Sequence, residues 1–284
     1  MENCEIKTVG IVGCGLMGSG WAQLCVSKGY RVIVAEQDQK SLERGLAIVK
    51  AGLESTGGPG GREAAEEKIR GTLTLDDMAA CDVVVETIPE KMYLKKKVFI
   101  ELDRVCADHA VLATNTSVLS VLDIAKATRR PERVLGFNTN PLIFPIAEII
   151  ETIVLAPGVL EAGRKFMVSL DKEVIIVKDS PGFILNRLIT SVVLNSIRLV
   201  ESGIASAHDI DRVITVSLGW KTGPLALADT IGLDTVLFGA TSLYHDLNDP
   251  QFAPPLILKK MVTAGLLGKK SGKGFFDYPR SSPE

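Results

Sequence analysis

The sequence predicts an α/β protein, with a Rossmann-type doubly wound parallel sheet followed by a second, all-helical C-terminal domain. Over the first 180 residues, short β-branched runs alternate with helical stretches, which is typical of a parallel sheet covered by helices. A G-x-G-x-x-G loop at 13–18 joins the first run to the first helical stretch. From Leu185 onward the apolar residues keep helical spacing and no strand alternation appears. We therefore expect two domains, 1–180 and 181–284.

The first domain opens with a predicted parallel βαβ unit. "KTVGIVG" predicts a strand, "LMGSGWAQLCVSKG" a helix and "YRVIVAE" a second strand, all within the first 36 residues. The further strands that we expect are 81–88, 110–116, 133–138 and 173–177, and the helices between them include 95–106 and 119–128. The glycine-rich stretch 55–61 is expected to be a turn or loop.

The second domain is predicted to consist of helices. They are expected at 184–203, 206–218, 233–247 and 255–268. Gly203 is predicted to end the first of them, and Ser206 to cap the second. An all-helical half of ~100 residues also offers a surface for a homodimer.

Composition excludes several classes of partner. A net charge of −2 gives no basic excess for nucleic acid or for a membrane surface, and no apolar run reaches the ~18 residues of a membrane span. The N-terminal residues lack the pattern of a signal peptide, so we expect a cytoplasmic protein. Its five cysteines show no C-x-x-C spacing, which favours reduced thiols over a disulfide or zinc framework. No metal site is expected.

The glycine loop predicts a dinucleotide site. The first glycine of the motif allows a tight turn, the second lets the backbone approach a pyrophosphate, and the third allows close packing of helix on strand. The pyrophosphate would rest on the helix N-terminus. The residues expected to contact the cofactor here are Gly13, Gly15, Leu16, Met17 and Gly18. The G-K-[ST] ending of an ATP-binding P-loop is absent.

Glu36 predicts that the cofactor is NAD rather than NADP. It ends the second predicted strand, 18 residues after Gly18. A carboxylate at this place accepts hydrogen bonds from the adenosine ribose hydroxyls and repels a 2′-phosphate. Gln37 and Asp38 follow, with no arginine. A glycine-rich turn without a ligand is the alternative, but the three features of the fingerprint occur together here.

With these features and several further segments, the chain resembles the 3-hydroxyacyl-CoA dehydrogenase family over nearly its whole length. The segments are "VGIVGCGLMGSGWAQ", "DVVVETIPEKMYLKKKVFIELD", "LATNTSVLSVLDIA", "DSPGFILNRL", "GPLALADTIGLDTV" and "GLLGKKSGKGFFDY". The resemblance implies a Rossmann domain with a helical dimerisation domain. It also implies NAD-linked oxidation of a 3-hydroxy group, or the reverse reduction.

The resemblance assigns roles to residues outside the glycine loop. Glu90 and Lys95 of "PEKMYLK" match residues that line the nicotinamide pocket. Ser117 of "TNTS" matches the serine that touches the substrate oxygen, and Asn115 lies on the cofactor side. Asn186 of "FILNRL" matches a substrate-side asparagine. Plainer alternatives exist, because Ser117 could cap a helix, Asn186 could bridge helices, and Glu90 with Lys95 could be a solvated charge pair.

One expected residue is missing. The family has a catalytic histidine in "HFFNP", whereas this chain reads "GFNTNP" at 136–141. Alignment on Gly136 places Asn138 at the histidine position, and alignment on "NP" places Phe137 there. Glu148 matches the glutamate that orients the histidine. The loop between them is shorter than in the family, so the local backbone is expected to differ.

The histidines of the chain lie elsewhere in the sequence, at 109, 208 and 245. Asparagine can hydrogen-bond a carbonyl but cannot exchange a proton near pH 7. The chain could be an oxidoreductase that uses another proton carrier, with Glu148, Ser117 or Lys95 as candidates. It could act on a C=N bond, since an iminium ion accepts hydride without a new acid. It could also bind NAD with little catalysis. Glu151 would lie one turn from Glu148 if that segment were helical.

The substrate handle also departs from the family. In the family, basic residues on the helices after the second strand help to hold CoA, but here the basic residues of 50–68 are Lys50, Arg62 and Lys68. A thioester of CoA, a carrier-protein thioester and a small free hydroxy or amino acid are therefore all candidate substrates. Trp220 stands where the family often has a histidine.

Overall fold

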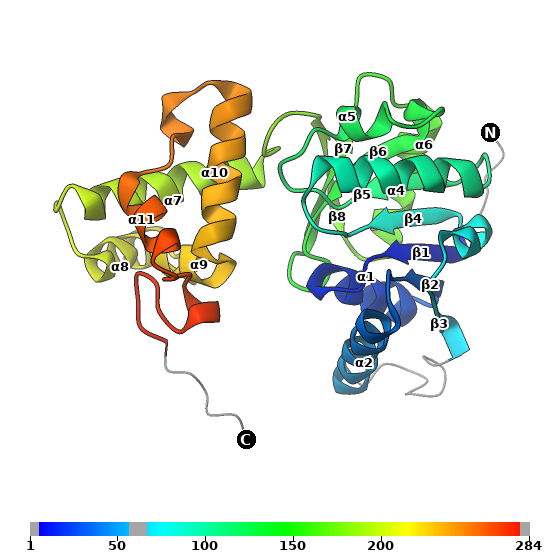
Figure 1. Ribbon diagram of the computed structural model, residues 1–284, viewed down its shortest axis with the longest axis horizontal. Coiled ribbons are helices and arrows are strands. Elements are labelled where there is room, and N and C mark those ends of the chain that lie inside the picture. Colours follow the sequence, from blue (N-terminus) through cyan, green and yellow to red (C-terminus); the bar gives the residue numbers. More distant parts are fainter. Residues whose placement is uncertain (1–5, 57–66, 279–284) are drawn as a thin grey trace. The chain divides into compact units, whose positions relative to one another are not determined.

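The structure, a computed structural model, describes residues 6–56 and 67–278. The chain divides into two compact units, Met1–Ser180 and Pro181–Glu284 (Figure 1). Each unit has its own hydrophobic core.

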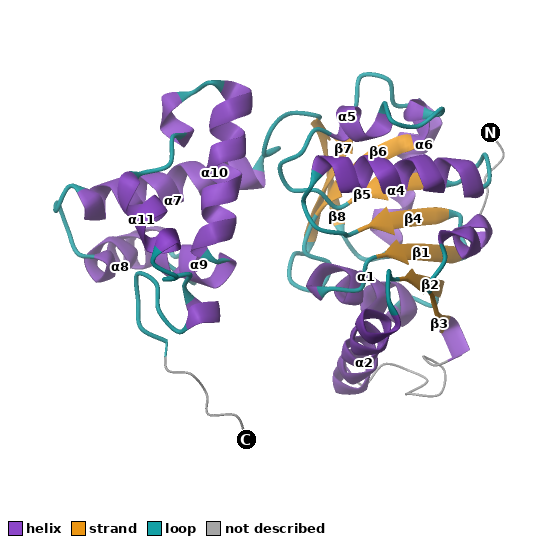
Figure 2. Ribbon diagram, in the orientation of Figure 1, coloured by secondary structure: helices purple, strands orange, loops and turns teal. Residues whose placement is uncertain are grey.

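The first unit is built on one sheet of eight strands (Figure 2). They are β1 (Thr8–Val12), β2 (Arg31–Ala35), β3 (Ile69–Thr72), β4 (Val83–Glu86), β5 (Val111–Thr114), β6 (Val134–Asn138), β7 (Ile146–Glu151) and β8 (Glu173–Lys178). Their order is β3-β2-β1-β4-β5-β6-β7-β8, and neighbours are parallel except β6 and β7. The strand order reverses between β1 and β4, and ligands of such sheets bind at the carboxyl ends there. The predicted Rossmann-type fold is confirmed.

Helices cover both faces of this sheet. They are α1 (Leu16–Ser27), α2 (Gln39–Thr56), α4 (Met92–Val105), α5 (Val121–Ala125) and α6 (Pro157–Ser169), with 3₁₀ turns η1 (Leu75–Ala80) and η2 (Pro131–Arg133). Buried side chains of α1, α2 and α6 join one core cluster with alternate residues of the strands, such as Val9 and Ile11. Helices α4 and α5 lie together on the other face (Figure 1). The central strands are buried on both sides, which explains their continuous apolar runs.

The second unit consists of helices, as predicted. They are α7 (Leu185–Glu201), α8 (Ala207–Leu218), α9 (Pro224–Ile231), α10 (Leu233–Leu247) and α11 (Leu256–Thr263), with η3 (Pro250–Phe252) and η4 (Lys269–Ser271). Ser206 caps α8 by accepting the Asp209 N–H at 3.1 Å. Gly203 follows α7 with a φ of +69°, a conformation that suits glycine. The buried Asp229 carboxylate accepts the N–H groups of Phe275 and Phe276, which ties the C-terminal segment to α9.

Strands β3 and β7 were not expected from the sequence, and β7 changes the reading of Glu151. Because 146–151 is a strand and not a helix, Glu148 and Glu151 point to opposite faces of the sheet. Glu151 forms an ion pair with Lys178 at 2.6 Å. The two carboxylates are therefore not neighbours, as they would be one turn apart on a helix. In the glycine-rich stretch 55–61, the first two residues end α2 and the others lie outside the described residues.

Two general expectations can be compared with the described part of the chain. No helix within residues 6–56 and 67–278 has the length and apolar character needed to cross a bilayer. The cysteines of this part, Cys14, Cys25, Cys81 and Cys106, are buried free thiols. Burial raises the pKa of the Cys14 thiol to about 11, so this thiol stays protonated near neutral pH.

Candidate active site

The predicted residues of the first unit lie along one edge of the sheet. Gly13 follows β1, Glu36 follows β2, Asn115 follows β5, and Asn138 is the last residue of β6. The carboxyl ends of parallel strands meet at the same edge, which here includes the switch point between β1 and β4. The sequence motifs are thus brought together at the place where this class of sheet binds its ligand.

The glycine loop makes a tight turn between β1 and α1. Gly13 adopts a φ of +91°, and Thr87 Oγ1 donates to its carbonyl oxygen at 2.8 Å. A Cβ on Gly18 would lie 1.9 Å from the Gly13 oxygen, so this position must be glycine for α1 to pack. A Cβ on Gly15 would meet nothing within 4 Å. Gly15 therefore faces open space at the N-terminus of α1, where Leu16 is exposed and Met17 half-buried.

Glu36 is held at the end of β2. Its Oε1 accepts the Cys14 N–H at 2.5 Å, and its Oε2 accepts the Gln37 N–H at 3.1 Å. Asp38, two residues later, accepts the Ser41 N–H at the start of α2. These carboxylates give the loop a negative charge next to the glycine turn. A ribose with free hydroxyls fits this surface better than one with a 2′-phosphate.

Lys95 is buried in a network of carboxylates that the sequence did not reveal. Its side chain is 1% exposed, and its Nζ lies 2.7 Å from Glu86 Oε1 and 3.2 Å from Glu90 Oε2. Glu86 is fully buried and also accepts the Thr114 hydroxyl at 2.7 Å. Burial raises the pKa of Glu86, and the Lys95 ammonium opposes this. The reading of Glu90 and Lys95 as a solvated charge pair is wrong, because Lys95 joins α4 to the end of β4.

Glu90 in turn holds the turn that carries Ser117. Its Oε1 accepts the Ser117 N–H at 2.9 Å and the Thr116 hydroxyl. The helix that follows begins at Val121, and its N-cap is Ser120, whose side chain accepts the Asp123 N–H at 3.2 Å. The alternative role of Ser117 as a helix cap is therefore wrong. Its side chain lies at the exposed edge after β5.

Asn115 links α1 to the end of β6. Its Nδ2 donates to the Phe137 carbonyl oxygen at 2.6 Å, and its Oδ1 accepts the indole N–H of the buried Trp21 at 3.0 Å. It therefore connects α1, β5 and β6. These contacts place Asn115 next to the residue that precedes Asn138.

Asn138 and Glu148 lie side by side on the neighbouring strands β6 and β7. They are register partners in the antiparallel pair of β6 and β7. Asn138 Nδ2 donates to Glu148 Oε2 at 2.5 Å, and Glu148 is 6% exposed. Of the two alignments of "GFNTNP", this geometry favours the one that places Asn138 at the histidine position. Phe137 points into the core, where it packs against Trp21 and Phe166.

No histidine of the first unit replaces the missing one. His109 lies before β5, and its Nε2 is 3.2 Å from Asp82 Oδ1. Asp82 precedes β4 and accepts the Lys7 and Thr8 N–H groups, so this pair lies at the amino edge of the sheet. His208 and His245 are exposed residues of α8 and α10 in the second unit.

Asn186 belongs to the second unit. It is the second residue of α7, within the helix rather than at its cap, which is Ile184. The structure thus brings together Asn115, Ser117, Asn138 and Glu148 with the glycine loop in one unit. Asn186 is placed on a separate unit, at the start of its longest helix.

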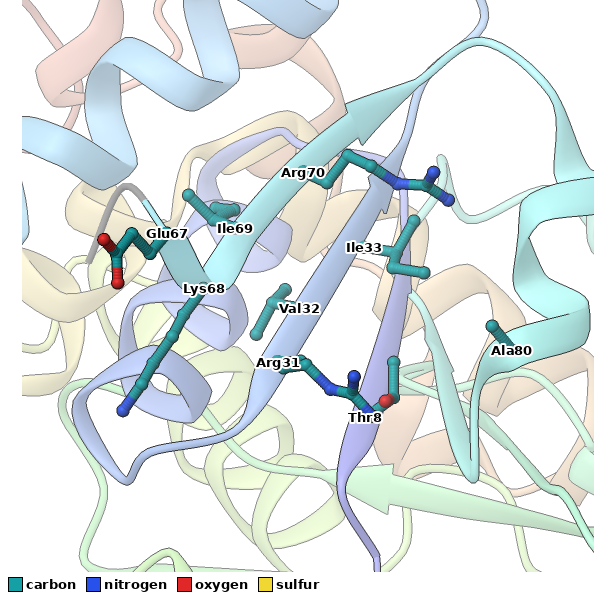
Figure 3. Close-up of a pocket in the computed structure, with 9 residues that line it drawn as sticks. All are labelled: Thr8, Arg31, Val32, Ile33, Glu67, Lys68, Ile69, Arg70 and Ala80. Carbon is teal, nitrogen blue, oxygen red and sulfur yellow. The ribbon is translucent and has the colours of Figure 1, made fainter. Parts of the chain in front are cut away.

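A hollow on the first unit lies away from these residues. It is lined by the first residues of β1, β2 and β3, with Arg31, Lys68 and Arg70 around it (Figure 3). These are the amino halves of the strands, whereas the glycine loop follows their carboxyl ends. The hollow is not the dinucleotide site.

Comparison with known proteins is consistent with this arrangement. The family model described as "3-hydroxyacyl-CoA dehydrogenase, NAD binding domain" matches residues 8–180, and "3-hydroxyacyl-CoA dehydrogenase, C-terminal domain" matches 182–278. The 3-hydroxybutyryl-CoA dehydrogenase of Mycobacterium tuberculosis is 37% identical over 96% of this chain and 99% of its own length. The human mitochondrial hydroxyacyl-coenzyme A dehydrogenase is 34% identical, over 96% and 91%. The crystal structure of (S)-3-hydroxybutyryl-CoA dehydrogenase from Ralstonia eutropha superposes with a TM-score of 0.92 at 33% identity, covering 97% of this chain and 100% of that one.

Proposed function

Because the chain belongs to the 3-hydroxyacyl-CoA dehydrogenase family, we propose that it transfers hydride between NAD(H) and a 3-hydroxyacyl or 3-oxoacyl thioester, with Glu148 as the proton carrier. The enzyme class is an NAD-dependent dehydrogenase that acts on a CH–OH group. The domain boundary at residue 180 then separates the NAD-binding domain from a domain for substrate and dimer contacts.

The residues of the first unit fit NAD. Gly15 leaves open space beside the N-terminus of α1, where a pyrophosphate can approach. The Glu36 carboxylate lies at the end of β2, where the adenosine ribose is bound in this fold. Glu90 and Lys95 would lie beside the nicotinamide, which supplies the hydride chemistry when the cofactor is bound. The task of the chain is to orient the substrate and to manage one proton.

The Asn138–Glu148 pair is the observation that carries the proposal. A carboxylate that faces the end of β6 and is almost fully buried can hold a proton in a place shielded from water. Asn138 can hydrogen-bond both a carbonyl and that carboxylate, but it cannot itself supply the proton. We therefore assign orientation to Asn138 and proton transfer to Glu148. Ser117 and Asn186 are proposed to contact the substrate.

A reaction at a C=N bond is the second candidate. The same pair of side chains favours it, because the buried Glu148 carboxylate would stabilise an iminium cation directly. An iminium substrate already carries its proton, so the reaction would need no histidine to supply one. A protein that binds NAD with little catalysis is the third reading. The connected network of Lys95, Glu90 and Ser117 argues against it, since it orders an exposed turn at the carboxyl end of β5.

We also propose a cytoplasmic homodimer with a small-molecule substrate, bound as a CoA or carrier-protein thioester. No nucleic acid or membrane partner is proposed, since the net charge is −2.

The experiment that tests the function is NADH oxidation with three substrates at equal concentration. These are acetoacetyl-CoA, free acetoacetate, and a ketone supplied with an amine. We expect acetoacetyl-CoA to be turned over, but at a lower rate than by family members that have the histidine, because loss of a positioned acid typically costs ~10²–10⁴ in rate. Turnover that requires the amine would establish the C=N reaction instead. Absence of turnover in all three, with tight NADH binding, would support the non-catalytic reading.

A further inference from the structure

Lys172 is a buried lysine that neither the family resemblance nor the proposed reaction uses. It follows α6 at the entry to β8 and is 9% exposed. Its Nζ donates to the Pro141 carbonyl oxygen at 2.6 Å and to the Phe144 carbonyl oxygen at 2.5 Å. Burial lowers the pKa of its ammonium group. Burial of a charged ammonium group is costly unless it is hydrogen-bonded. Here both hydrogen bonds go to backbone oxygens of a single segment.

The segment is the loop 139–145, which joins the two residues of the proposed proton-transfer pair. It begins directly after Asn138, and β7, which carries Glu148, begins directly after it. The Thr139 hydroxyl donates to the Ile146 carbonyl oxygen at 2.8 Å, across the base of the loop. Asn140 Oδ1 accepts two backbone N–H groups, from Leu142 and Ile143, within the loop.

The backbone around Lys172 adds further contacts with the same loop. The Glu173 N–H donates to the Pro145 carbonyl oxygen at 2.9 Å, and Glu173 is the register partner of Ile146. The residue before Lys172, Asp171, adopts a φ of +58° that turns the chain from α6 into β8. The loop is thus fastened from within by Thr139 and Asn140, and from the neighbouring turn by Lys172.

We propose that Lys172 is a positioning residue for the reaction, which holds the 139–145 loop in the conformation that sets Asn138 against Glu148. This inference rests on the proposed function of that pair. The residues at the two ends of the loop must meet across one register position. A side chain that donates to two carbonyl oxygens of the loop, from the turn before β8, holds the loop in one conformation. Misplacement of a reacting group by ~1 Å can cost ~10²-fold in rate.

The test is a comparison of Lys172→Met with Lys178→Met. Lys178 is the last residue of β8, is 79% exposed and pairs with Glu151, so its replacement removes a nearby lysine without touching the loop. We expect Lys172→Met to lower kcat by at least about tenfold while the Kd for NADH stays unchanged. Lys178→Met should behave as the unmodified protein. Lys172→Arg can still donate to both carbonyl oxygens and should recover part of kcat. It also gives a folded variant to measure if Lys172→Met does not fold.

A double-mutant cycle with Glu148→Gln separates positioning from a general structural role. If Lys172 acts through the pair, Lys172→Met should add little to the loss already caused by Glu148→Gln. Independent, fully additive losses would overturn the inference, and so would an unchanged kcat in folded Lys172→Met.

Hydrogen exchange tests the same inference without a substrate. In Lys172→Met, or in the neutral and shorter Lys172→Gln if the former does not fold, amides of 136–150 should exchange faster while those of β1 and β4 stay protected. Unchanged exchange in 136–150 would reject the role of Lys172. Absence of turnover in the unmodified protein would count against the proposed function alone.

Discussion

Two glycines of the loop after β1 should respond in opposite ways to one methyl group. A Cβ on Gly18 would lie 1.9 Å from the Gly13 oxygen, whereas a Cβ on Gly15 would meet nothing within 4 Å. We expect Gly18→Ala to destabilise the fold by about 1–3 kcal/mol, as overpacking does. Gly15→Ala should keep its stability and lose NADH affinity, because the methyl group occupies the space of the pyrophosphate. Thermal unfolding and NADH titration of both variants check this, and equal destabilisation of the two would contradict it.

Glu36 is expected to decide between NAD and NADP. Glu36→Ala should weaken NADH binding and relax the preference, because both the hydrogen-bond acceptor for the ribose and the negative charge are lost. Glu36→Gln is the matched control, since its amide oxygen can still accept the Cys14 N–H that Glu36 accepts at 2.5 Å. It should gain NADPH affinity with less loss of NADH affinity. Tighter binding of NADPH than of NADH by the unmodified protein would refute the assignment.

Among single residues, features fixed within a short stretch could be predicted from the sequence, whereas contacts between residues far apart in the chain could not. The glycine spacing and Glu36 follow from a short stretch whose geometry is fixed by its own backbone. Lys95 lies in helix α4, and its burial depends on Glu86, the last residue of strand β4, and on Thr114, the last residue of β5. Nothing in "PEKMYLK" reveals those neighbours. Ser117 was an alternative N-cap for α5, but the N-cap is Ser120 because the helix begins at Val121.

At the scale of elements, α4 is anchored at both ends. Lys95 holds its first turn, and Asp103 near its last turn accepts hydrogen bonds from Arg129 and Arg130. Burial opposes the charge on Asp103, but the two arginines outweigh it and the pKa of this carboxyl is lowered. Since α4 carries Lys95, these hydrogen bonds also support the ion pairs of Lys95 with Glu86 and Glu90.

Asp103→Asn should lower stability in a pH-dependent manner. A carboxyl whose pKa is lowered by folding stabilises the protein above its ordinary pKa of ~3.9, and this contribution is lost as the pH falls through the lowered value. We expect a loss of about 1–3 kcal/mol at pH 7, typical for hydrogen bonds to charged groups. The difference from the unmodified protein should shrink towards pH 3. Denaturant unfolding at both pH values measures it, with Asp108→Asn, the exposed partner of Arg130, as control. A loss that is the same at both pH values would argue against the ion pair.

Of the two strands that were not expected from the sequence, β7 shows why most clearly. β7 reads "IAEIIE", which lacks the alternation of a half-exposed strand because it is buried on both sides. Its antiparallel pairing with β6 depends on the 139–145 loop, whose hydrogen bonds to Lys172 involve a residue 28 or more positions away. The strongly periodic helices of the second unit were predicted because their apolar faces repeat within one segment.

At the scale of the whole molecule, we expect a dimer formed through the second unit. Its helices expose large apolar side chains, most clearly Val213, Val216 and Leu218 of α8 and Leu188 of α7. Exposed apolar surface of this kind marks interfaces between subunits. Light scattering at micromolar protein should give twice the monomer mass of 30.5 kDa. Val213→Glu with Val216→Glu should yield a monomer, and a monomeric unmodified protein would contradict the prediction.

The fold class and the family were predictable from the sequence, because the glycine fingerprint and the segments of the helical half are read locally. The residue expected at the family's histidine position was not predictable, because two alignments of "GFNTNP" were open. The sheet register, which places Asn138 opposite Glu148, favours one of them. The Asn138–Glu148 hydrogen bond joins residues 10 positions apart on two paired strands, so the pairing in the folded chain was needed to find it.

The most direct test of the account is the pH profile of kcat for the unmodified protein and for Glu148→Gln, with acetoacetyl-CoA and NADH. If Glu148 carries the proton, Glu148→Gln should lower kcat by ~10²-fold or more, the range typical of a lost acid–base group. The titration seen in the unmodified enzyme should disappear, and the Kd for NADH should stay unchanged. A Glu148→Gln variant that keeps most of its activity and the same pH profile would contradict the account.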